Sequence, residues 1–204
     1  RATPAGAIFD PVVIHAGGIA LTGDRLLVAA TFGGIREFRL ANILRLPARS
    51  RLLGHSHVLP QTAAYSPADG DDHRLRYSFL SLETGEREPS DVVRLVAGEY
   101  DTAQDGRLAR VELTESGAVS RQEIVPGISG MQGAALHRGT WFVSSSRGTE
   151  PGELWVGTPA GFRREGPLPP GPEDLAVWPE RNQVWSVTEW PGKRWVFWRE
   201  LPRA

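Results

Sequence analysis

Short hydrophobic runs separated by turn residues make up most of the chain. The runs are rich in Val, Leu, Phe and Trp, and they end at Gly or Pro, of which the sequence contains 23 and 16. Segments with helical periodicity are scarce, and the clearest one, residues 41–46, is ended by Pro47 because proline supplies no amide hydrogen. This pattern predicts an all-β fold in which residues 41–46 form a short helical connecting turn.

One unit of strands recurs four times along the chain. Each copy has a small apolar first strand, a hydrophobic second strand, a glycine turn and a third strand. The first strands are expected at residues 18–21, 78–82, 133–136 and 174–177. The second strands are expected at residues 26–31, 95–100, 141–146 and 184–189. The glycines that follow them are Gly34, Gly106, Gly152 and Gly192, and the third strands come directly afterwards.

Repeats of this kind are typical of β-propeller blades. A two-sheet sandwich is the competing architecture, but it has no need to repeat the same three-strand unit four times. The fourth copy lacks a fourth strand, and we expect the hydrophobic run at residues 11–15 to close it by pairing the two chain ends. We therefore predict one β-propeller domain over residues 1–204. Its four recognisable blades close alone or belong to a larger five- or six-bladed ring.

Composition and charge limit the classes of partner. The chain has 204 residues, of which 40% are hydrophobic and 23% charged, as in a globular protein. Its 23 basic and 24 acidic side chains give a net charge of −1, so no overall positive field favours nucleic acid. Cysteine is absent, which excludes disulfides, and no run of about 18 apolar residues is present to span a membrane. The chain begins at Arg1 without Met, which fits a processed exported protein or a trimmed one.

Four short strings give the chain a family likeness: HAGGIA at residues 15–20, MQG at 131–133, GPEDL at 171–175 and TEWPGKR at 188–194. With them the chain resembles a largely uncharacterised group of exported β-propeller proteins from GC-rich actinobacteria. Lys193 is its only lysine, a bias that agrees with such an origin. The resemblance covers most of the chain and implies a propeller fold and a secreted, extracellular protein. Proteins of this group carry further propeller sequence upstream of the segment that resembles residues 15–20. The resemblance therefore implies either that the four blades close into a ring alone or that a second chain completes the ring.

Polar residues gather where we expect the loops of one propeller face. The loops that lead into first strands and those that join second to third strands open on the same face, around the axis. The residues that we predict to bind ligand there are Glu99, Gln132, Arg147, Glu173, Asp174, Glu189 and Trp190. A Trp beside carboxylates suits stacking on a sugar ring or contact with a protein. We therefore expect an exported binding or scaffold module that recognises a carbohydrate or a protein through this polar top face.

The alternative hypothesis is a hydrolase or lactonase of the calcium-dependent propeller type. Glu173 and Asp174 would bind the cation, and His15, Glu173 and Glu189 are the candidate catalytic residues. Carboxylates at a strand start equally suit hydrogen bonding to backbone amides, which fastens one blade to the next, and His15 equally suits packing. No Gly-x-Ser-x-Gly, phosphate-binding loop or His-Glu-x-x-His motif is present, so serine-hydrolase, nucleotide-dependent and zinc-protease chemistry find no support.

Overall fold

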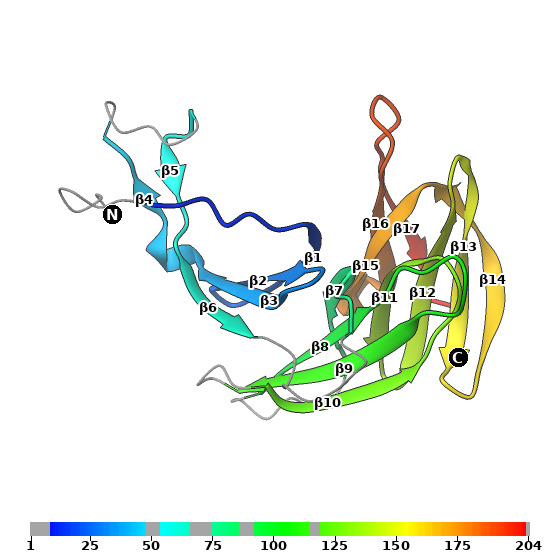
Figure 1. The fold of residues 1–204 in the computed structure, drawn as a ribbon. Helices are drawn as coiled ribbons and strands as arrows, with labels where there is room; N and C mark the ends of the chain where they lie inside the picture. Colours follow the sequence, from blue (N-terminus) through cyan, green and yellow to red (C-terminus); the bar gives the residue numbers. More distant parts are fainter. Residues whose placement is uncertain (1–8, 48–53, 66–74, 86–91, 115–118, 203–204) are drawn as a thin grey trace.

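The computed structural model describes residues 9–47, 54–65, 75–85, 92–114 and 119–202. Within them, four antiparallel sheets stand side by side around a common centre, as the blades of a propeller do (Figure 1). The first blade consists of β1 (Ala16–Thr22), β2 (Arg25–Ala30), β3 (Gly34–Arg39) and β6 (Gln61–Tyr65). The second consists of β7 (Phe79–Leu82), β8 (Val92–Gly98), β9 (Arg107–Thr114) and β10 (Val119–Pro126).

The third blade consists of β11 (Met131–His137), β12 (Thr140–Arg147), β13 (Glu150–Thr158) and β14 (Gly161–Pro170). The fourth consists of β15 (Pro172–Trp178), β16 (Gln183–Thr188) and β17 (Val196–Glu200). In each blade the chain starts at the centre and proceeds outward, and β1, β7, β11 and β15 contact one another there in chain order (Figure 1). The predicted all-β propeller with four blades is confirmed.

Turn residues set the hairpins of the blades. The connection between β11 and β12 is Arg138 and Gly139, with φ of 50° and 76°, which is the two-residue turn that matches the twist of antiparallel strands. The first blade also carries a small hairpin, β4 (Leu44–Arg45) with β5 (His57–Val58), that projects away from the other blades (Figure 1).

Three hydrophobic cores form, one between each pair of successive blades. Their representatives, in order, are Leu27 with Leu95, Phe79 with Leu136, and Leu154 with Leu175. Side chains of a strand point alternately to its two faces, so the second and third blades each contribute to the cores on both of their sides. Leu136 of β11 packs toward the second blade, for example, and its neighbour Ala135 packs toward the fourth. In the described part of the chain, no such core joins the fourth blade to the first.

The first strands approach one another closely at the centre, which explains the small residues there. A Cβ on Gly133 would lie 2.5 Å from the Cα of Asp174, so only glycine fits between these blades. A buried serine adds a polar link across the same boundary, because Ser144 Oγ donates to the Glu173 carbonyl at 2.9 Å. Close backbone approach and buried hydrogen bonds therefore hold the third and fourth blades together.

The N-terminal segment does not close the last blade, contrary to the prediction. Residues 11–15 form no strand, and Val13 is 90% exposed. The Thr31 amide donates to the His15 carbonyl at 3.2 Å, which holds the segment to the first blade, and Pro11 offers no amide for a strand ladder. Among the described residues the last blade has three strands, whereas each of the others has four. The side between the fourth and first blades is therefore open.

The helical turn predicted over residues 41–46 is correct only at its start. A single 3-10 turn spans Leu40–Asn42, and strand β4 follows it. Another 3-10 turn of the described residues, Pro179–Arg181, joins β15 to β16. Neither these turns nor any other helix in the described ranges has the length and apolar character needed to cross a membrane.

Candidate functional site

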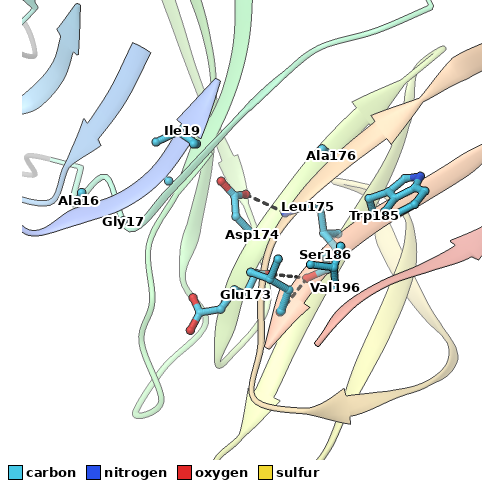
Figure 2. A pocket seen from close by; sticks show the side chains of 12 residues that line it. Ala16, Gly17, Ile19, Glu173, Asp174, Leu175, Ala176, Trp185, Ser186 and Val196 are labelled. Atoms are coloured by element: carbon cyan, nitrogen blue, oxygen red, sulfur yellow. Dashed lines mark hydrogen bonds between the residues drawn. The ribbon is translucent and has the colours of Figure 1, made fainter. Parts of the chain in front are cut away.

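A cavity of about 410 Å³ opens between the first and fourth blades. Figure 2 shows β1 on one side of it and β15, β16 and β17 on the other. The residues that line it are Ala16, Gly17, Gly18, Ile19, Glu173, Asp174, Leu175, Ala176, Trp185, Ser186, Val187 and Val196. Its walls are mainly apolar, and Glu173 and Asp174 supply its acidic groups.

Asp174 uses both carboxylate oxygens inside the protein. Oδ2 accepts the amide of Leu80 at 3.0 Å, and Oδ1 accepts the amide of Leu175 at 2.8 Å. The first of these bonds runs from the second blade to the fourth, so the side chain fastens two blades across the centre. Burial raises the pKa of Asp174 well above its ordinary value and outweighs the two amide bonds, and the charge of Glu173 adds to the rise.

Glu173 is the half-buried carboxyl of the cavity. Burial, and then the charge of Glu189, raises the pKa of Glu173 to about 7. Its backbone carbonyl accepts the hydroxyls of Ser144 and Ser186, at 2.9 and 3.2 Å, and the bond from Ser186 is drawn in Figure 2. Within the described residues the carboxyl group itself takes part in no ion pair. It is therefore free to exchange a proton near neutral pH or to meet a ligand.

Glu99 lies outside the cavity, in a buried ion pair. Arg107 donates Nε to Oε2 and Nη2 to Oε1, both at 2.8 Å, and the Arg76 amide donates to Oε1 at 3.0 Å. Burial alone would raise the pKa of Glu99, but the hydrogen bonds from Arg107 and Arg76 hold it below its ordinary value. The arrangement ties the β8–β9 connection to the segment that leads into β7.

His15, Gln132 and Arg147 also lie outside the cavity. His15 Nδ1 is 2.8 Å from the hydroxyl of Thr31, at the start of the turn between β2 and β3. Gln132 is the second residue of β11 and is half-buried. Arg147, at the end of β12, is exposed and lies 3.5 Å from the carboxylate of Glu153. None of these three residues is among those that line the cavity.

Trp190 and Glu189 follow β16 beside the cavity. The Trp190 indole donates to the Gly148 carbonyl at 3.3 Å, and its ring covers Gly171. Trp190 is therefore half-buried rather than freely exposed. Glu189 is exposed, and its charge raises the pKa of Glu173, just as the charge of Glu173 raises the pKa of Asp174.

Sequence reasoning did not identify the apolar residues of the opening as a surface. Three indoles, those of Trp178, Trp185 and Trp198, cross the face of the last blade with ring centroids 6.1 and 6.4 Å apart. The guanidinium of Arg181 lies 4.5 Å from the Trp178 ring. Trp178 and Trp198 are exposed, as is Val196 beside them. The one sequence signal for this surface is the missing fourth strand of the last repeat.

Metal ligands do not cluster in the described ranges. No group of three or more His, Asp and Glu side chains there has an arrangement able to hold a metal ion. Glu173 and Asp174 contribute two carboxyl groups to the cavity wall, and calcium at these residues stays a prediction.

No protein-family model and no curated protein matches the chain. Among solved structures, a chain of the nidogen–laminin complex is 11% identical with a TM-score of 0.47, and the match covers 89% of this chain and 64% of that one. The Dos1 propeller is 10% identical with a TM-score of 0.44, over 85% of this chain and 42% of that one. The computationally designed protein Ika4 is 11% identical with a TM-score of 0.39, over 94% and 95%. Because each TM-score is below 0.5, we take the fold from the strand topology alone.

Proposed function

We propose that this propeller is a scaffold whose binding surface is the open side between the fourth and first blades, and that a partner protein docks there. The observation that carries the proposal is that the two blades facing the opening expose side-chain positions that the other blades bury against each other. Contiguous exposed apolar side chains are typical of interaction sites on folded proteins.

The fourth blade exposes what the third blade buries. In the strand ladders, Phe142 pairs with Val156 just as Trp185 pairs with Trp198, and Leu154 occupies the position of Val196. Leu154 is 0% exposed and Val156 is 3% exposed because the fourth blade covers them. Their counterparts Val196 and Trp198 are 71% and 48% exposed. The fourth blade therefore has apolar residues where the third blade packs against its neighbour, but no blade of the described chain covers them.

The first blade presents the complementary face. Leu21 of β1 and Leu136 of β11 hold the same position, one residue before the end of the first strand. Leu136 is 2% exposed against the second blade, whereas Leu21 is 51% exposed. Ile19, two residues earlier, is exposed as well and lines the cavity. Both walls of the opening are thus suited to packing against protein side chains.

A protein suits this surface better than a carbohydrate. Sugar hydroxyls need hydrogen-bonding groups beside an aromatic platform. Of the polar groups expected to provide them, three are engaged within the fold: Glu99 with Arg107, Asp174 with backbone amides, and the Trp190 indole with a carbonyl. The residues of the open face are mainly apolar, which supports a protein partner.

Native mass spectrometry of the chain, purified under native conditions from its own host, tests the proposal. We expect the wild type to carry a second polypeptide and Val196→Asp to lose it, because a carboxylate in the docking surface would be desolvated. The matched control is Ile124→Asp, which places the same charge on an exposed residue of the outer strand β10. If Val196→Asp still carries the second polypeptide, the partner does not dock on the open side. If the wild type carries mass increments of sugar units instead of a polypeptide, the partner is not a protein.

A second candidate function is a hydrolase, and the observation that favours it is the pKa of Glu173. A carboxyl with a pKa of about 7 beside Glu189 changes protonation near neutral pH, as a general acid-base requires. This candidate keeps calcium at Glu173 and Asp174, and its base, His15, lies outside the cavity beside Thr31. It predicts one calcium per chain and lactone hydrolysis, both lost in Glu173→Gln. Metal analysis and a lactonase assay that find neither in the wild type count against it.

Export and a single domain over residues 1–204 also stand as proposals. Export rests on the likeness to exported actinobacterial propellers, and fractionation of the host culture checks it. The shared cores between successive blades support one folding unit, for which we expect a single unfolding transition. A second polypeptide that completes the ring is the form of partner most in keeping with the open side.

A further inference from the structure

The outer edge of β17 is unpaired within the described residues. In each of the other three blades a fourth strand pairs with the third: β6 with β3, β10 with β9, and β14 with β13. In the last blade, β17 pairs with β16 alone. Exposed strand edges of this kind accept a further strand unless they are covered or blocked, and no proline interrupts β17.

The backbone groups of this edge follow from the ladder. The Thr188 amide donates to the Trp195 carbonyl at 3.0 Å, and the Leu201 amide donates to the Asn182 carbonyl at 2.9 Å. Because hydrogen bonding alternates along an antiparallel strand, the odd-numbered residues of β17 face β16. The residues that direct their N–H and C=O groups outward are Val196, Trp198 and Glu200. The edge therefore offers three donors and three acceptors in a regular array.

The same residues also carry the exposed side chains of the open face. Val196 is 71% exposed and Trp198 is 48% exposed, and Trp198 lies against Trp185. A strand added at this edge would place every second side chain beside them, on the same face of the sheet. Main-chain pairing and apolar packing would thus act together.

We propose that the partner docks by strand addition: an extended segment of the partner protein pairs antiparallel with Val196–Glu200 as the fourth strand of the last blade. This rests on the proposed function, because it specifies how a protein occupies the open side. The side chains of β17 determine which partner sequence fits. The partner segment carries a basic residue opposite Glu200 and apolar residues opposite Trp198 and Val196, with polar residues between them.

The test supplies such a segment in cis to the full chain. The strand Lys-Thr-Val-Thr-Val is appended after Ala204 through a Gly-Ser linker of about eight residues, which keeps it at millimolar effective concentration. The control extension is Lys-Thr-Pro-Thr-Pro, in which proline removes the amide donors opposite Trp198 and Val196. Hydrogen exchange of the outward amides of β17 is measured in both, together with acrylamide quenching of tryptophan fluorescence.

We expect the outward amides to exchange about tenfold more slowly with the valine extension than with the proline control, and acrylamide quenching to fall in parallel. Equal exchange in the two extended chains overturns strand addition. Protection in the unextended chain that grows with protein concentration also overturns it, in favour of a second copy at this edge. Strand addition is also overturned if cellohexaose slows the exchange of these amides while the valine extension does not. Native mass spectrometry of Val196→Asp does not depend on these amides. A partner that docks on the open side without strand pairing would therefore give equal exchange in the two extended chains but would still be lost in Val196→Asp.

Discussion

Leu21→Ala and Leu136→Ala form a matched pair that tests whether the side of the first blade is open. The two leucines hold the same position in the first strands of blades one and three. Leu136 is 2% exposed in the core with Phe79, Val96 and Trp141, whereas Leu21 is 51% exposed. The same substitution therefore removes the same atoms from two different environments.

The expected costs differ severalfold. At Leu136 the substitution leaves a cavity in a closed core, which costs about 3 kcal/mol of unfolding free energy. At Leu21 no enclosed cavity forms, and half of the side chain already faces solvent, so the cost is about 1 kcal/mol or less. Since the second value includes only the buried half of the leucine, we expect a difference of about 2 kcal/mol between the two variants.

Urea unfolding followed by tryptophan fluorescence measures both values. With a slope of about 2 kcal/mol per molar urea, the midpoint should fall by about 1.5 M for Leu136→Ala and by about 0.5 M or less for Leu21→Ala. Equal losses would refute the reasoning, because they would mean that β1 is covered in solution. Repeating the measurement at several protein concentrations shows whether a second copy provides such a cover.

Three further outcomes follow from the centre of the molecule. Folding raises the pKa of Glu173 from 4.5 to about 7, so the folded state binds more protons than the unfolded state in this pH range, and stability falls as the pH rises. Glu173→Gln should reduce the loss of stability between pH 5 and pH 8 by about 1 kcal/mol, measured by urea unfolding at the two pH values. Asp174→Ala should cost about 2 kcal/mol, because the buried Leu80 amide loses its acceptor, and Asp174→Asn should cost less; thermal unfolding of the two variants checks this. Gly133→Ala should cost more than about 2 kcal/mol, because its Cβ would meet the backbone of the fourth blade at 2.5 Å, while Gly161→Ala, with no atom within 4 Å, should change stability by less than about 0.5 kcal/mol in the same assay.

The repeat made the blades predictable from the sequence. A glycine after each hydrophobic second strand and the spacing of the first strands depend on local chain geometry, and the structure has strands at all four copies. The closure of the ring was wrong because it depends on a long-range pairing. Residues 11–15 have the apolar character of a strand, but Pro11 and the bond from Thr31 to His15 keep them with the first blade.

The candidate site was predicted in part, because sequence shows which residues share a loop position and not which bonds they form. Glu173 and Asp174 do line the cavity, as neighbours at the start of β15. Glu99 was indistinguishable from them in sequence, and its pairing with Arg107 depends on the turn after β8. The alternating Val196 and Trp198 have the pattern of a covered face, and only the three-dimensional arrangement shows that nothing in the described chain covers them.

Hydroxyl-radical footprinting of the isolated chain tests the central claim most directly. It compares the labelling rates of Val196 and Trp198 on the open face with those of Leu154 and Val156, their counterparts under the fourth blade. After correction for intrinsic reactivity, we expect the first two residues to be labelled many times faster than the second two, in proportion to their exposure. Equal protection of both sets at every protein concentration would contradict an open side and, with it, the docking surface.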